Sequence, residues 1–254
     1  MSTPTTTGTG ARSVAPIAAI VLTYRLLLRQ LVTRGRVLAL LAVGLAVAAV
    51  AWAVGASDEV TDPLDASVGV IAGLGLTVLV PIVSLVFATA ALGDAREDGT
   101  LVYLWLRPID RWPVVVGAWL AALTVSLPLT LGPLALAALL SGQAGTVLGA
   151  TMAASVVGAI AYSAVFLLVG LLVKNPIVWG LGYVLIWEGI ISAFGSSAAQ
   201  LAISGYTRSI VTAMTDVDVD LGDQSLGVAV VVPIVVAVVA LVVAARRLDR
   251  MDVA

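Results

Sequence analysis

A short polar segment, Gly93 to Arg111, carries the residues best suited to binding another molecule. It holds seven charged side chains, although only 11% of the chain is charged. Its charges offer complementarity to a water-soluble partner, and its apolar and aromatic residues offer contact area. An ordinary solvated loop is the alternative. The charged residues of interest are Asp94, Arg96, Glu97, Asp98, Arg107 and Arg111, and the contact residues are Leu101, Tyr103, Leu104 and Trp105.

The local chemistry of this segment predicts a short helix between two longer ones. Gly99 can supply the left-handed turn that ends the preceding helix, and Thr100 can cap the turns that follow. Leu101 to Leu106 then form the short apolar helix. Pro108 disfavours helix at the residue before it, and Asp110 stands where the next helix would be capped.

The sequence provides poorly for catalysis. It contains no His and no Cys, which removes Ser–His and Cys–His nucleophilic pairs and the common zinc sites. It also lacks a Gly-x-x-x-x-Gly-Lys-Ser/Thr phosphate loop, so we do not expect the chain to hydrolyse ATP by that chemistry. We therefore expect a non-catalytic chain that binds no metal or cofactor of its own and no nucleic acid.

Glu188 is the only acid inside a long apolar stretch. A carboxyl group in lipid is costly, so such a residue is a candidate functional site. The structural alternative is that Glu188, close to the end of its stretch, hydrogen-bonds Trp, Ser or backbone groups and positions the segment that follows.

Composition identifies the class of protein. Hydrophobic residues make up 61% of the 254 residues, more than a soluble core needs, so we expect an integral membrane protein. Its apolar runs are continuous rather than alternating, which predicts an all-α fold of membrane-spanning helices. With about 20 residues per crossing, six spans are expected, near residues 37–56, 67–92, 112–140, 147–173, 176–194 and 226–245.

The basic residues predict the orientation of these spans. Twelve of the thirteen Lys and Arg residues fall on one side of a six-span topology, and only Arg208 falls on the other, together with eight acids. The positive-inside rule makes the basic side cytoplasmic. Both termini and the segment 93–111 are therefore expected in the cytoplasm, and the segment 195–225 outside.

The N-terminal region is expected to have two parts. Residues 1–13 are rich in Thr and Ser and predict a disordered tail. Residues 14–34 predict an amphipathic helix lying along the inner membrane surface, with Ile17 and Val21 on its apolar face and Arg25 and Arg29 on another. A seventh span is the alternative, but it would bring both arginines into lipid at a cost of roughly 2.5 to 3.5 kcal/mol each.

The stretch EDGTLVYLWLRPIDRWPVVVGAW resembles the signature between spans two and three of ABC-2 type exporter permeases. These permeases also resemble this chain in having an amphipathic elbow helix, six spans, cytoplasmic termini and a short re-entrant outer segment after span five. The resemblance implies that the segment 93–111 is a coupling loop. Together with the elbow helix, this loop would dock on a separate cytoplasmic ATPase.

The resemblance further implies a permease subunit of an ATP-driven exporter in a bacterial cytoplasmic membrane. It would work as a dimer with a second copy or a related permease, and ATP and Mg²⁺ would bind only to the partner ATPase. A six-span secondary carrier or a membrane scaffold protein is the alternative. A carrier normally shows internal repeats and broken helices, and the sequence contains no convincing repeat.

Overall fold

The computed structural model describes residues 15–57, 62–97, 110–141, 145–190, 200–215, 217, 219 and 224–250. This part of the chain forms helices and no strand. The expected tail, most of the coupling loop and parts of the outer segment lie outside the described residues.

Five helices are long and apolar enough to cross a membrane. They are α2 (Arg34–Gly55), the continuous run of α3 (Pro63–Val70), η1 (Ile71–Leu79) and α4 (Val80–Glu97), then α6 (Arg111–Leu140), α7 (Thr146–Leu172) and α11 (Leu226–Asp249). All have at least 22 residues, and about 20 suffice for a crossing. The chain is therefore all-helical and compatible with a multi-pass membrane protein.

The fifth predicted span corresponds to a shorter apolar helix in the described residues, Pro176–Ile190. It consists of α8 (Pro176–Gly182) and the π-helical stretch η2 (Tyr183–Ile190). The predicted range of 176–194 extends beyond the last described residue of this helix, so the count of six spans stays a prediction. Within the expected outer segment, residues Ile203–Thr215 form the helix α10.

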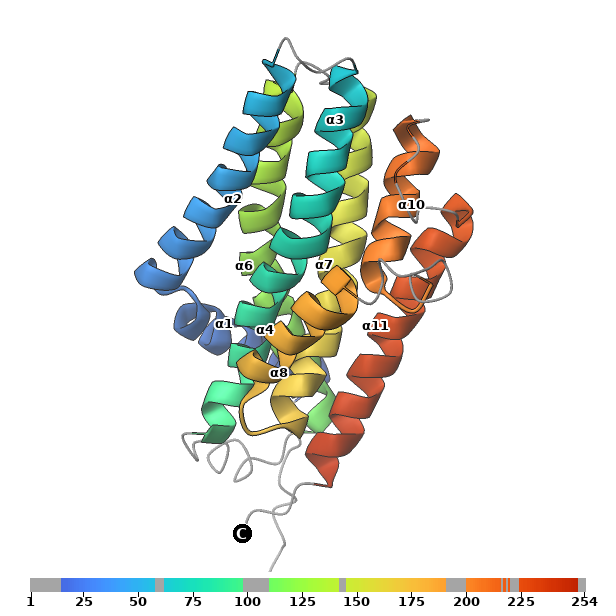
Figure 1. The fold of residues 1–254 in the computed structure, drawn as a ribbon. Helices are drawn as coiled ribbons and strands as arrows, with labels where there is room; N and C mark the ends of the chain where they lie inside the picture. The colour runs from blue at the N-terminus through green and yellow to red at the C-terminus, as the bar shows by residue number, and fades with distance from the viewer. Residues whose placement is uncertain are drawn as a thin grey trace, which may run out of the picture.

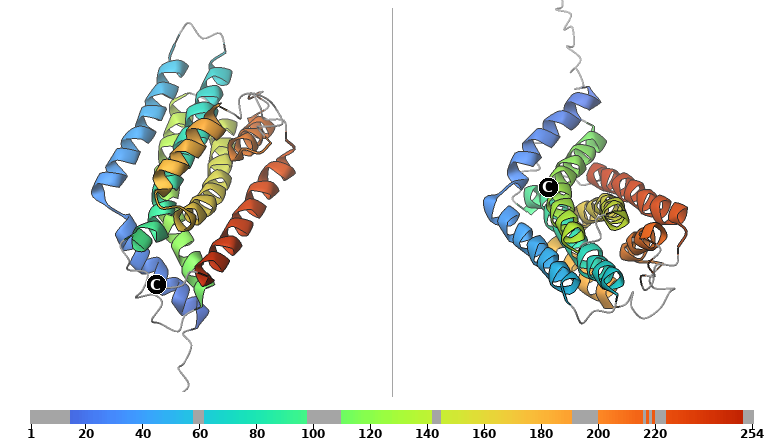
Figure 2. Two further views of the ribbon diagram at one scale, coloured as in Figure 1. Left: turned by 60° about the horizontal axis from the view of Figure 1, so that its bottom comes forward. Right: turned by 90° about the horizontal axis from the view of Figure 1, so that it is seen from above.

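The helices form one bundle around a core shared by α4, α6 and α7 (Figures 1 and 2). Helices α4 and α7 run in the same direction, because Val80 meets Gly158 near one end of their contact and Thr89 meets Gly170 near the other. Small residues let these backbones approach closely, as is usual between membrane helices. Pro133 similarly packs on Gly44 of α2 from within the uninterrupted helix α6.

Helix α1 (Pro16–Leu31) crosses one end of the bundle rather than running along it (Figure 2). Its buried residues are Ala19, Thr23, Leu27 and Leu31, whereas Arg25 and Arg29 are exposed. Ile17 and Val21, which the sequence assigns to the apolar face, are also exposed. Ile17 and Val21 therefore lie outside the side of α1 that packs on the bundle. That α1 lies on a membrane surface stays a prediction.

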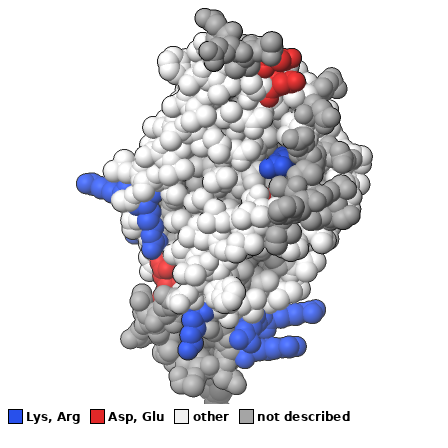
Figure 3. All heavy atoms as spheres, in the orientation of Figure 1, with Lys and Arg blue, Asp and Glu red and all other residues white. Residues whose placement is uncertain are grey.

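Charged side chains are unevenly distributed over the described surface (Figure 3). We define the basic end of the bundle by α1, the start of α6 and the end of α11, which carries Arg246 and Arg247. The acidic end is defined by Asp62 and Asp65 at the start of α3. The first and last described helices both reach the basic end, and which side of a membrane this end faces stays a prediction.

Candidate functional site

The expected coupling loop is bracketed at the basic end by the last turn of α4 and the first turn of α6. Arg96 and Glu97 belong to that last turn, and Arg111 is the first residue of α6. The following candidates lie outside the described residues: Asp98, Gly99, Thr100, Leu101, Tyr103, Leu104, Trp105, Arg107 and Pro108.

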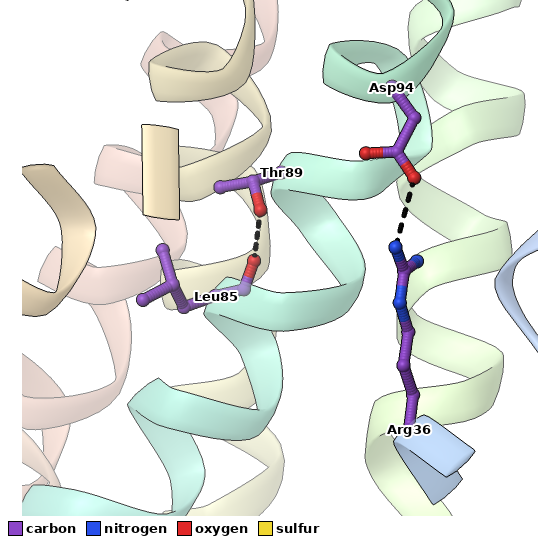
Figure 4. Close-up of polar contacts among 4 residues, drawn as sticks. All are labelled: Arg36, Leu85, Thr89 and Asp94. Carbon is purple, nitrogen blue, oxygen red and sulfur yellow. Dashed lines mark hydrogen bonds and ion pairs between the residues drawn. The ribbon is translucent and has the colours of Figure 1, made fainter. Parts of the chain in front are cut away.

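Asp94, one of the loop candidates, forms an ion pair with Arg36. Its carboxylate lies 3.2 Å from the guanidinium of Arg36, which joins the last turns of α4 to the start of α2 (Figure 4). The side chains are 53% and 38% exposed, so the ion pair contributes at most about 1 kcal/mol. A hollow of about 190 Å³ lies beside Asp94 and is also lined by Thr89 and Asn175. From the sequence, Arg36 was only one of the twelve basic residues on the predicted cytoplasmic side, and no partner was predicted for it.

Gly117 brings α1 into direct contact with α6, six residues after α6 begins. A Cβ atom at this position would lie 2.8 Å from the carbonyl oxygen of Ile20 and 3.2 Å from the backbone nitrogen of Tyr24. The Tyr24 hydroxyl also donates to Thr124 Oγ1 on α6, at 3.3 Å. These contacts fix α1 to the helix that follows the segment 93–111, and the sequence pattern did not indicate them.

Glu188 is fully buried, and the donors to its carboxylate include one side chain and two backbone groups. The Tyr183 hydroxyl donates to Oε1 at 2.7 Å, and the backbone N–H groups of Ile203 and Ser204 donate to Oε1 and Oε2 at 3.1 and 3.0 Å. Both N–H groups belong to the first turn of α10, where the helix dipole also favours a negative charge. In the structural alternative for Glu188, this side chain hydrogen-bonds to backbone groups and positions the segment that follows. The contacts with Ile203 and Ser204 are of this kind.

Arg208 of α10 forms a second polar contact with the bundle. Its Nη2 and Nε groups donate to Thr77 Oγ1 at 2.8 and 3.3 Å. The Thr77 hydroxyl in turn donates to the carbonyl oxygen of Ala72, five residues earlier, at 3.0 Å. Arg208 and Asp65 line a hollow of about 330 Å³ at the side of α10. The one basic residue on the acidic side of the predicted topology is therefore held by a specific side chain.

The contacts of α10 with Thr77 and Glu188 are both made with π-helical stretches, since Thr77 lies in η1 and Glu188 in η2. Such stretches occur frequently at functional sites. The sequence marks Glu188 as a lone acid but gives no local signal for Thr77, because its partner is 131 residues away. The described residues contain no group of three or more acids that could hold a metal ion.

Comparison with known proteins does not assign this chain to a family. No family model matches the sequence, and no curated protein matches it. The function must therefore be inferred from the residues, their geometry and the family resemblance of the segment between α4 and α6.

Proposed function

We propose that the chain is the permease subunit of an ATP-driven exporter of the ABC-2 type, which couples a separate ATPase to transport through the segment 93–111. The observation that carries the proposal is the position of this segment in the chain. It joins α4 to α6, and these two helices share the core with α7. A force applied to the segment would therefore reach most of the bundle.

The packing of α4 supports this transmission. Several of its side chains are completely buried, among them Val83, Leu85, Phe87 and Leu92. Helix α6 contacts α1, α2, α4, α7 and α11. Because packed interiors have few voids and low compressibility, a displacement at the ends of α4 and α6 would move their neighbours rather than be absorbed locally.

Helix α1 offers a second contact for the ATPase. It lies at the basic end against α6, and its exposed side carries Arg25 and Arg29. An acidic surface on the ATPase would complement these charges, which favours rapid association and a fixed register. In this proposal the basic end is cytoplasmic, six spans cross a bacterial inner membrane, two permeases form a dimer, and ATP and Mg²⁺ bind to the ATPase.

Co-purification with an ATPase encoded by a neighbouring gene tests the proposal. We expect a stable complex, and the combined substitution Asp98→Ala, Trp105→Ala and Arg107→Ala should weaken it at least tenfold, since residues of this kind dominate interfaces. Lys174→Gln is the matched control, because Lys174 is an exposed charge outside the segment. Absence of a complex, or equal binding by the triple variant and the control, would refute the docking proposal.

A further inference from the structure

We propose that the hollow beside Asp94 binds the ethanolamine headgroup of a phospholipid. The hollow has a volume of about 190 Å³ and is lined by Thr89, Asp94, Asn175 and the first residues of α8. An ethanolamine headgroup joins a primary ammonium to a phosphate, so the site must accept N–H donors and also offer a positive charge. The inference rests on the chain being a membrane protein and not on the proposed ATPase, because phospholipid headgroups are present at either membrane surface.

The hollow lies where the ends of three helices meet at the basic end of the bundle. The Cβ position of Gly93, in the last turns of α4, lies 3.7 Å from Gly170 near the end of α7 and 3.7 Å from Pro176 at the start of α8. Carboxyl-terminal ends of helices carry a partial negative charge, so the ends of α4 and α7 favour a cation, and the single amino-terminal end of α8 opposes them. Ends of membrane-spanning helices lie at the level of the lipid headgroups.

The polar groups of the hollow are suited to accept hydrogen bonds. An ionised carboxylate only accepts, and one oxygen of Asp94 is turned away from Arg36, toward the side of Thr89 (Figure 4). The Thr89 hydroxyl already donates to the carbonyl oxygen of Leu85 at 2.7 Å, so toward the hollow it acts as an acceptor. Asn175 precedes α8, but its side chain does not cap that helix, and its amide oxygen is a third acceptor. A primary ammonium has three N–H donors to match them.

Arg36 supplies the positive charge for the phosphate. Its contact of 3.2 Å with Asp94 is made by Nη2, and a guanidinium has five N–H donors in all. The side chain is 38% exposed, so a phosphate can reach it from the membrane surface. Hydrogen bonds between a guanidinium and a phosphate are among the strong ones. With its ammonium on Asp94 and its phosphate on Arg36, the headgroup would lie antiparallel to the ion pair of the protein.

The apolar side of the hollow indicates that the ligand is a lipid and not a soluble amine. Ile177 and Val178 line the hollow and are 46% and 67% exposed. Trp179, the next residue, is 67% exposed, and tryptophan is enriched at the headgroup level of membranes. A phospholipid would cover these side chains with the upper part of its acyl chains, whereas a soluble amine would leave them uncovered.

Lipids that differ only in methylation of the nitrogen test the ammonium site. Phosphatidylethanolamine has three N–H donors, its monomethyl and dimethyl derivatives have two and one, and phosphatidylcholine has none. The natural chain, purified in detergent, is titrated with each lipid at identical acyl chains, and bound lipid is counted by native mass spectrometry. We expect the affinity to fall stepwise, by about tenfold or more over the series, because hydrogen bonds to charged groups are lost. Equal affinities across the series would overturn the proposal.

Two substitutions separate the headgroup from the ion pair. Asp94→Asn should abolish the preference for phosphatidylethanolamine over phosphatidylcholine. Arg36→Gln breaks the same ion pair but keeps the carboxylate, so it should weaken binding of all four lipids and preserve their order. Asp65→Asn is the matched control, because Asp65 is an exposed acid at the acidic end, and it should change nothing in the series. Persistence of the preference in Asp94→Asn, or its loss in Arg36→Gln, would contradict the site.

A soluble headgroup tests the source of the ligand. Glycerophosphoethanolamine carries the same ammonium and phosphate without acyl chains, so it cannot cover Ile177 and Val178. We expect it to bind at least about tenfold more weakly than the lipid, since apolar burial is lost. Equal affinity of the two would exclude a lipid as the occupant. Each comparison is made within one variant, so a change in its stability cannot imitate a change in lipid order. None of these results depends on the ATPase, and loss of ATPase binding would refute only the docking proposal.

Discussion

The substitution Gly117→Ala gives a direct measure of how α1 is attached to the bundle. The added methyl group would lie 2.8 Å from the carbonyl oxygen of Ile20, 2.9 Å from Thr23 Cβ and 3.2 Å from the Tyr24 nitrogen. Two of these three atoms belong to the backbone of α1, so a side-chain rotation cannot relieve the contact. Helix α1 must move away from α6 instead.

The size of the effect follows from two opposing contributions. Replacing a helical glycine by alanine stabilises the helix by about 1 kcal/mol. Overpacking a close contact costs about 1 to 3 kcal/mol. The net effect on Gly117→Ala should therefore lie between about zero and 2 kcal/mol of destabilisation. Gly149→Ala is the matched control, because Gly149 is an exposed helical glycine with nothing within 4 Å of its Cβ position, and it should be stabilising.

Denaturation of the purified protein in detergent, followed by circular dichroism, measures both variants against the natural chain. We expect the two alanine variants to differ by about 1 to 3 kcal/mol in the free energy of unfolding. Faster tryptic cleavage at Arg25 in Gly117→Ala should report the displaced α1. If both variants are stabilised equally and cleavage is unchanged, the backbone of α1 does not contact Gly117 closely, and the reasoning is refuted.

Two further substitutions test contacts of different strength. Trp119→Phe removes the 2.9 Å hydrogen bond from the indole N–H to Ser163 Oγ between α6 and α7, and should cost about 0.5 to 1.5 kcal/mol in the same denaturation assay. Adding Ser163→Ala should cost little more, and full additivity would contradict the bond. Arg36→Gln breaks the exposed ion pair with Asp94 and should cost less than about 1 kcal/mol, an effect that disappears in 1 M salt. A larger loss that is insensitive to salt would show that Arg36 does more than pair with Asp94.

Hydropathy and local signals predicted most of the long helices closely. The predicted range of 112–140 corresponds to Arg111–Leu140, and 147–173 corresponds to Thr146–Leu172. A helix in lipid must satisfy its backbone groups within itself, so its existence depends on a continuous apolar run that the sequence displays. The run predicted at 67–92 begins earlier, at Pro63, because the Asp62 carboxylate accepts from two backbone N–H groups and caps the helix there.

Contacts between distant segments could not be predicted in the same way. Glu188 was recognisable as a lone acid, but its partners Ile203 and Ser204 lie 15 and 16 residues further along the chain. The apolar face predicted for α1 concerned the membrane surface, and the sequence did not indicate that Ala19, Thr23, Leu27 and Leu31 would be the buried residues of this helix. Periodicity describes a helix alone and carries no information about the surface that it meets.

The sequence by itself determined that this chain is helical, apolar and asymmetric in charge, because hydropathy and charge are sums over local residues. Only the tertiary structure decided which residues hold the helices to one another. The pairing of Arg208 with Thr77 and the seating of Glu188 on α10 depend on where separate segments end in space. Buried polar groups need hydrogen-bond partners. Which partner each group meets depends on how the distant segments pack, and this is a property of the whole fold.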